Sequence, residues 1–132
     1  MNEDKRTIRV VAAVIENDGR YLVTKRRPTA VLPDLWEFPG GKVEPAEDDA
    51  VALKREFIER LAAPIAVGEL ISYVRHPYEK YTVELFLYSC NLLSDTLTCK
   101  GVAEYAWITS KEFDDYMFTP ADEQSMNQLL GE

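Results

Sequence analysis

The spacing of hydrophobic residues changes once along this chain, and the change restricts the fold more than any other feature. Residues 46–61 are predicted to form one amphipathic helix, because apolar side chains recur at three- and four-residue steps, at Ala50, Leu53, Phe57 and Leu61. The segments before and after this helix are rich in β-branched and aromatic residues, which is typical of strands. Strands and helices that interleave without a regular strand–helix–strand repeat indicate an α/β chain with a mixed sheet and helices on both faces.

Turn residues mark the ends of the other expected elements. Residues 16–19 have the composition of a hairpin turn, and Pro120 suits the first turn of a helix. Strands are expected at 7–16, 20–27, 35–38, 68–77, 81–91 and 105–108, with a glycine turn at 40–41. Two further helices are expected at 110–116, capped by Ser110, and at 121–130.

The length and charge of the chain restrict its organisation and its partners. The 132 residues suit a single domain spanning 1–132, because two cores of half that size would each be marginal. The chain has 15 Lys and Arg against 23 Asp and Glu, which gives a net charge of −8. Binding to a nucleic acid polymer needs a basic face, so DNA and RNA are not expected as partners. A small phosphate compound remains compatible when a divalent cation bridges the like charges.

The protein is expected to be cytoplasmic and to have no contact with a membrane. The first residues are charged and lead into no apolar stretch of the kind that signal peptides carry. The longest apolar run, residues 10–15, is far shorter than the roughly 20 residues of a membrane-spanning helix. Cys90 and Cys99 form no CxxC pair and are expected to be free thiols.

A candidate cation site combines the predicted helix with the glycines before it. Successive helical residues turn by about 100°, which places Glu56 and Glu59 on the side opposite the apolar stripe. Gly40 has no Cβ, so its carbonyl can approach a ligand closely. Two carboxylates and a carbonyl, completed by water and substrate phosphates, suit Mg²⁺, or Mn²⁺ in its place. The spacing alone also fits, and more simply, a solvated helix face on which Glu56 pairs with Arg60.

A longer pattern of defined spacing surrounds this helix. It consists of Gly41, then Glu47 after five residues, then Arg55, Glu56, Phe57 and Glu59 after seven more. This pattern resembles the Nudix box, and residues 35–45 and 119–123 resemble segments of the MutT-like branch of that family. The resemblance covers nearly the whole chain and implies the Nudix-type α/β/α sandwich with a mixed sheet. It also implies hydrolysis of a nucleoside diphosphate linked to another group, usually with Mg²⁺.

The chain departs from the Nudix pattern at three positions. Arg60 stands where the box has a second adjacent glutamate, and Ala62 stands where it has its closing glycine. The first departure replaces a negative charge by a positive one beside the expected cation, while the second matters only if the turn needs a positive φ. A further family carboxylate lies six residues before the tryptophan matched by Trp107, and this chain has Gly101 there. Glu104 is a nearby candidate replacement.

Three accounts of these departures remain open. In the first, a reduced site made of the Gly40 carbonyl, Glu56 and Glu59 holds one Mg²⁺ and supports slow hydrolysis or hydrolysis with an altered ion requirement. In the second, Arg60 contacts the substrate phosphates and supplies part of the charge of a second cation. In the third, catalysis is lost and the domain only binds a nucleotide or a protein partner.

The resemblance also implies roles for individual residues of the helix. The implied catalytic set is Glu47, Arg55, Glu56 and Glu59, in which Glu56 and Glu59 are metal ligands together with Gly40. Arg55 would orient these ligands through an ion pair with Glu47. Glu47 and Glu44 are the candidate bases.

The expected substrate contacts come from other parts of the chain. Asp122 matches the position at which MutT-like enzymes place Asn or Asp against the base edge, although a polar residue in the first turn of a helix is an equally good interpretation. Arg26 and Lys80 match strand positions that approach the nucleotide, and each also fits an exposed strand charge. Arg60 is the candidate phosphate contact of the second account.

These observations together predict a Mg²⁺-dependent nucleoside triphosphate pyrophosphohydrolase that yields a nucleoside monophosphate and pyrophosphate. By resemblance, the expected substrate class is an oxidised purine nucleotide or CTP. The alternative is a catalytically impaired nucleotide-binding or regulatory module on the same scaffold.

Overall fold

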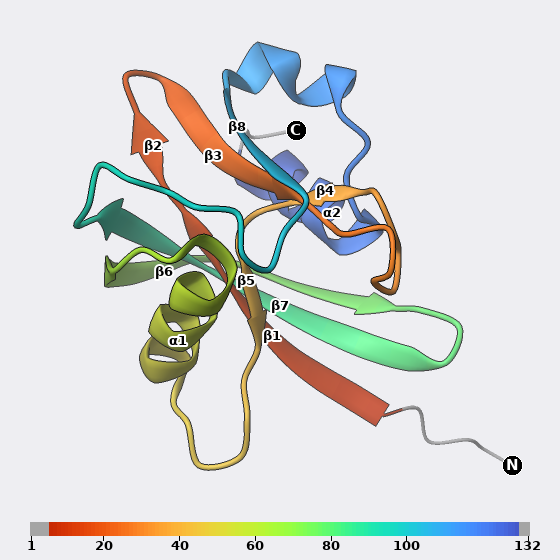
Figure 1. Ribbon diagram of the computed structural model, residues 1–132. Helices are drawn as coiled ribbons and strands as arrows, with labels where there is room; N and C mark the ends of the chain where they lie inside the picture. The colour runs from red at the N-terminus through yellow and green to blue at the C-terminus, as the bar shows by residue number, and fades with distance from the viewer. Residues whose placement is uncertain (1–5, 130–132) are drawn as a thin grey trace, which may run out of the picture.

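The computed structural model describes residues 6–129, which form two four-stranded sheets and three helices. The strands are β1 (Arg6–Val14), β2 (Glu16–Asn17), β3 (Arg20–Lys25), β4 (Trp36–Glu37), β5 (Gly40–Lys42), β6 (Ile65–Pro77), β7 (Tyr81–Leu92) and β8 (Glu104–Ile108). The helices are α1 (Asp49–Leu61), the 3₁₀ helix η1 (Ser110–Asp115) and α2 (Pro120–Leu129). The first sheet, which contains β1, β5, β6 and β7, passes between α1 and α2 in Figure 1, and β2, β3 and β8 extend above it.

The first sheet is mixed, as the sequence predicts. Its strand order is β5-β1-β7-β6, in which β1 and β7 run parallel and the other neighbours run antiparallel. The second sheet is antiparallel, with β3 paired to β2, β4 and β8. The α/β fold with helices on both faces is therefore confirmed.

Alternating side chains of β1 divide the hydrophobic core into two parts. Val11 and Ala13 pack in one cluster with the buried face of α1, while Ala12 and Val14 pack in the other with residues of α2. This alternation follows from the two-residue period of a strand, and here both faces of the strand are covered. The sheet that carries the glycines thus lies directly against α1.

Helix α1 begins three residues later than the sequence predicts. Asp48 is its N-cap, because an Asp48 side-chain oxygen accepts a hydrogen bond of 2.9 Å from Val51 N. At the other end, the C-cap residue Ala62 is left-handed with φ 55°. This is the turn at which the Nudix box has glycine, so the alanine is strained there.

We expect Asp48→Ala to lower the free energy of unfolding by about 1 kcal/mol, because the first turn of α1 loses its side-chain acceptor. Chemical denaturation monitored by circular dichroism measures this change. The matched control is Glu79→Ala at an exposed carboxylate in the β6–β7 turn, which is expected to leave the midpoint unchanged. Equal midpoints for the two variants would contradict the assigned cap.

The predicted glycine turn at 40–41 is wrong. Gly40 and Gly41 lie in strand β5, where they pair antiparallel with Ala12 and Val11 of β1. The absence of a side chain at Gly40 is required by packing, since a Cβ there would lie 1.9 Å from the carbonyl oxygen of Val11. The glycines therefore allow a close approach between two strands, not a change of chain direction.

Several other element boundaries differ from the predicted ones. Strand β6 begins at Ile65 and not at residue 68, and the predicted hairpin segment 16–19 includes the short strand β2. The short helix after β8 is a 3₁₀ helix whose N-cap is Thr109 and not Ser110. Leu130, the last residue of the predicted C-terminal helix, lies outside the described residues. No helix within residues 6–129 is long and apolar enough to cross a membrane.

Candidate functional site

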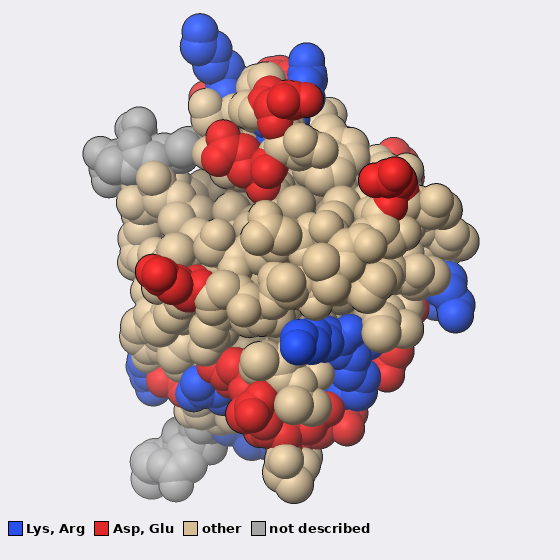
Figure 2. Space-filling model, turned by 90° about the vertical axis from the view of Figure 1, so that its left-hand side faces the viewer, with Lys and Arg blue, Asp and Glu red and all other residues tan. Residues whose placement is uncertain are grey.

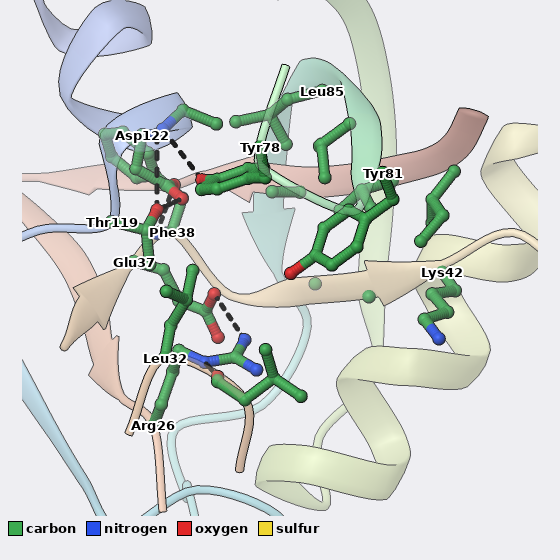
Figure 3. Close-up of a pocket in the computed structure, with 18 of the residues that line it drawn as sticks. Arg26, Leu32, Glu37, Phe38, Lys42, Tyr78, Tyr81, Leu85, Thr119 and Asp122 are labelled. Carbon is green, nitrogen blue, oxygen red and sulfur yellow. Dashed lines mark hydrogen bonds and ion pairs between the residues drawn. The ribbon is translucent and has the colours of Figure 1, made fainter. Parts of the chain in front are cut away.

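A cavity of about 520 Å³ lies beside the first sheet and reaches the start of α2. Its wall is formed by strands β1, β4, β5 and β7, by the segment that follows β3, by the last turn of α1, by the β6–β7 turn and by α2. Figure 3 shows Thr119 and Asp122 at one end of the cavity, Arg26 and Glu37 along one side, and Lys42 across from them. The cavity therefore brings together residues from nearly the whole length of the described chain, from Arg6 to Asp122.

Asp122 is held rigidly at the α2 end of this cavity. Phe38 N donates a hydrogen bond of 3.0 Å to Oδ1 of Asp122, and the hydroxyl of Thr119 donates to Oδ2. The residue is only 5% exposed. Burial raises the pKa of Asp122 to about 7, and the negative charge of Glu37 adds to this rise. Asp122 can therefore present either a protonated or an ionised carboxyl group near neutral pH.

Glu37 forms the neighbouring part of the wall. Arg26 donates to Glu37 over 3.0 Å, and its Nε donates to the carbonyl of Val31 over 2.7 Å. Burial raises the pKa of Glu37, while the adjacent Arg26 opposes the rise. The cavity thus has an acidic end made of Asp122 and Glu37, with Arg26 fixed beside it.

Basic side chains form the remainder of the polar wall. Arg6, Lys42, Arg60 and Lys80 line the cavity together with Arg26, in a chain whose net charge is −8. Five cationic residues against two acidic ones give the cavity a sign opposite to that of the whole protein. Such a wall can attract a polyanionic ligand.

Arg55 connects the glutamates of α1. Its Nε and one terminal nitrogen bind the two carboxylate oxygens of Glu47 at 2.7 and 2.9 Å, which is the ion pair that the sequence predicts. Its other terminal nitrogen contacts Glu56 at 3.2 Å and Glu59 at 3.3 Å. Hydrogen bonding to Glu47 raises the pKa of Arg55, and the same interaction lowers the pKa of Glu47. Arg55 therefore forms ion pairs with three carboxylates.

The prediction that Glu56 lies on the face opposite the core is wrong. Glu56 is 8% exposed and lies on the same side as Ala52 and Leu53. Glu56 precedes Phe57 on the helix and lies at the margin of the apolar stripe. Its side chain therefore points toward β5. A Cβ at Gly41 would lie 2.1 Å from the Glu56 carboxyl carbon, so the missing side chain of Gly41 makes room for this carboxylate.

Arg60 covers the cavity side of Glu56. Its Nε donates to Oε1 of Glu56 over 2.8 Å, while Arg55 contacts Oε2. Arg60 lines the cavity, whereas Glu56 and Glu59 are not among the lining residues. Figure 2 shows basic and acidic side chains next to one another at the lower end of the molecule, the level at which Figure 1 shows α1.

A family model described as a NUDIX domain matches residues 10–128. The chain belongs to the Nudix family. The CTP pyrophosphohydrolase of Escherichia coli (strain K12) is 35% identical over 115 residues, which cover 87% of this chain and 85% of that protein. An 8-oxo-dGTP diphosphatase of Haemophilus influenzae is 30% identical over 130 residues, which cover 98% of this chain and 96% of the relative.

The fold of this Nudix protein also matches solved structures. The solution structure of the E. coli ORF135 protein superposes with a TM-score of 0.81 and 31% sequence identity, over 96% of this chain and 91% of that one. Because the family model matches and these relatives are named as hydrolases of nucleoside triphosphates, the protein is a Nudix hydrolase of the MutT-like branch.

The predicted site residues fall into two groups in this Nudix fold. Arg26, Gly40, Arg60, Lys80 and Asp122 line the cavity. The four α1-side residues, Glu47, Arg55, Glu56 and Glu59, form a connected network behind Arg60. Glu104, the candidate replacement for a missing carboxylate, instead pairs with Lys25 at 3.6 Å and is not among the residues that line the cavity.

Glu37 is the site residue that sequence reasoning missed. It stands between Trp36 and Phe38, and the alternation of a strand places it on the opposite side from these two aromatic residues. A charged residue in that position, three residues before Gly40, was a usable signal. Its pairing with Arg26 depends on the register of β3 against β4, which is a tertiary feature.

Nudix hydrolases generally use divalent metal ions such as Mg²⁺, so the donor set matters. Within residues 6–129, no group of three or more His, Cys, Asp or Glu side chains is placed to hold a metal ion. Glu56 and Glu59 remain, and both oxygens of Glu56 face arginines. Two carboxylates do not form a protein cage, so a divalent ion held by them would keep water and substrate phosphates as its other ligands.

Proposed function

We propose that this Nudix hydrolase is a nucleoside triphosphate pyrophosphohydrolase that releases a nucleoside monophosphate and pyrophosphate. The cavity supports this proposal, because it joins an acidic, hydrogen-bonded end to a basic wall. The first end suits the polar edge of a base and the second suits a phosphate chain. The substrate class we propose is CTP or an oxidised purine nucleotide, on which the relatives named above act.

In this proposal each polar end of the cavity holds one part of the nucleotide. Asp122 reads the base edge, since its carboxyl group is fixed by Phe38 N and the Thr119 hydroxyl. Arg26 and Lys80 approach the sugar and phosphates from the sides of the cavity. Fixing both ends of the substrate lowers the entropy cost of bringing phosphorus and water into line.

The hydrolytic step consumes one water molecule. Its oxygen forms a bond to phosphorus while the bridging oxygen between the first and second phosphates leaves, and a carboxylate takes the proton. Glu47 is held by two nitrogens of Arg55, which lower its pKa, so it acts as a positioning residue. Glu44 is then the proposed base. A bound Mg²⁺ would supply charge neutralisation at the phosphates, with Glu56, Glu59 and the Gly40 carbonyl as its protein ligands.

The proposal also covers the organisation and location of the protein. We assign residues 1–132 to one Nudix domain that acts in the cytoplasm on free nucleotides. No DNA, RNA or membrane partner is part of it.

A second candidate function follows from the arginines around Glu56. Since both oxygens of Glu56 accept from arginines, the same cavity suits a nucleotide-binding module with impaired catalysis. The two candidates differ in turnover alone.

A nucleotide panel tests the proposed function. The purified protein is incubated with CTP, 8-oxo-dGTP and the common nucleoside triphosphates, with Mg²⁺ or Mn²⁺, and released pyrophosphate is measured. We expect Mg²⁺-dependent pyrophosphate release from CTP or 8-oxo-dGTP above that from the other nucleotides. If no member of the panel is hydrolysed while CTP or 8-oxo-dGTP binds, the binding module is the correct function.

A further inference from the structure

Two of the Nudix departures touch each other in the structure. The backbone nitrogens of Lys100 and Gly101 donate to the Arg60 carbonyl at 2.9 and 3.1 Å. A Cβ at Gly101 would lie 3.2 Å from both Cα and Cγ of Arg60. A larger residue at 101 would therefore press on the stem of the arginine. The Nudix pattern has a carboxylate at both positions, and in this chain glycine at 101 leaves room for the stem of Arg60.

The orientation of Arg60 leaves its phosphate-binding edge available. Within residues 6–129 the Arg60 side chain makes one hydrogen bond, from Nε to Glu56. By contrast, Arg55 uses both terminal nitrogens on protein groups, and Arg26 uses Nε and one terminal nitrogen. The two terminal nitrogens of a guanidinium can bind two phosphate oxygens at once.

The surroundings of Arg60 hold its side chain in place. Glu56 is buried and anchors the Nε side, so the guanidinium is held at the cavity wall without losing its terminal donors. Lys42 and Lys80 line the same cavity and add positive charge around it. A phosphate chain in this cavity would meet the anchored guanidinium of Arg60 where a Nudix box places a carboxylate for a metal ion.

We propose that Arg60 binds the phosphate chain of the nucleotide directly and allows this protein to hold a polyphosphate without a divalent cation. This proposal rests on the proposed function in that it concerns the same cavity and ligand. It goes further because it separates binding from the metal ion: the cation is needed for turnover but not for association. Arg60 is thus a substrate-binding residue of the wall.

Titration calorimetry in EDTA with inorganic tripolyphosphate tests this proposal. We expect the wild-type protein to bind tripolyphosphate, and Arg60→Gln to weaken the affinity about tenfold or more, since a charge-assisted bidentate contact is lost. Arg60→Lys keeps the charge without the fork and is expected to lie between the two. The matched control is Lys54→Gln, which removes one positive charge from an exposed position on the same helix and is expected to bind as the wild type does.

Metal titration of the same variants provides a second reading. Arg60→Glu restores a carboxylate and is expected to tighten Mg²⁺ binding while abolishing tripolyphosphate binding in EDTA. Circular dichroism of each variant checks that it is folded. If Arg60→Gln does not fold, Arg60→Lys replaces it in the comparison with the wild-type protein.

The proposal is overturned if wild-type protein binds tripolyphosphate only with Mg²⁺, or if Arg60→Gln and Lys54→Gln bind it equally well in EDTA. Failure of the proposed function gives a different result. In that case no nucleotide is hydrolysed, yet binding in EDTA is still present in the wild type and weakened in Arg60→Gln.

Discussion

Glu56→Gln is expected to lower Mg²⁺-dependent pyrophosphate release by about a hundredfold or more. The glutamine keeps the size of the side chain but removes the negative charge that Arg55 and Arg60 both contact. It also removes the carboxylate ligand that is best fixed in place, since Glu56 is buried against Gly41 whereas Glu59 is exposed. Steady-state rates at saturating CTP and at a series of Mg²⁺ concentrations measure this effect.

Folding and chemistry have to be separated for this variant, because the substitution leaves two partly buried arginines with less negative charge nearby. Thermal unfolding reports the structural part. Glu69→Gln, an exposed carboxylate on β6, is the charge-matched control and is expected to keep the wild-type rate. A folded Glu56→Gln protein with the wild-type rate and Mg²⁺ requirement would show that Glu56 is not a metal ligand.

The sequence predicts α1 well because the interactions that define it are local. The spacing of Leu53, Phe57 and Leu61 places the buried face correctly, and all three are buried. The pair between Arg55 and Glu47 also follows from the short distance between them along the chain and from the spacing of the Nudix box. Ala50 is the exception in the predicted stripe, since it is half-buried and Ala52 is buried in its place.

The parts that the sequence does not predict depend on how strands pair. The glycines of β5 look like a turn when only their flexibility is considered, but the carbonyl of Val11 on β1 is what excludes a side chain at Gly40. The burial of Glu56 depends on the same packing of α1 against β5. The role of Arg60 as a phosphate contact stays a prediction, and only the structure shows that Gly101 packs on its stem.

Asp122→Asn is expected to flatten the pH dependence of stability. The pKa of Asp122 is about 7 in the folded protein, above the ordinary value near 4 that applies after unfolding. Between these values the folded state carries one more proton than the unfolded state, so stability falls as pH rises. From pH 5 to pH 7 this group should cost the wild-type protein about 2 kcal/mol, a loss that asparagine, which does not ionise, avoids. Urea denaturation at several pH values measures the difference.

The same substitution is expected to change base preference, because protonated Asp122 both donates and accepts while its ionised form only accepts. The ratio of kcat/KM for CTP to that for 8-oxo-dGTP should shift about tenfold between wild type and Asp122→Asn, with little change in the Mg²⁺ requirement. Glu37, Arg26 and Thr119 face Asp122 and remain in the variant, but Glu37 loses a negative neighbour, so the rise in its own pKa is smaller there and the profile flattens in the same direction. Asp115→Asn, at an exposed position, is the control. An equal loss of activity on every nucleotide would assign Asp122 to structure and not to base recognition. If the substitution leaves the change of unfolding free energy with pH unaltered, the pKa of Asp122 is near its ordinary value.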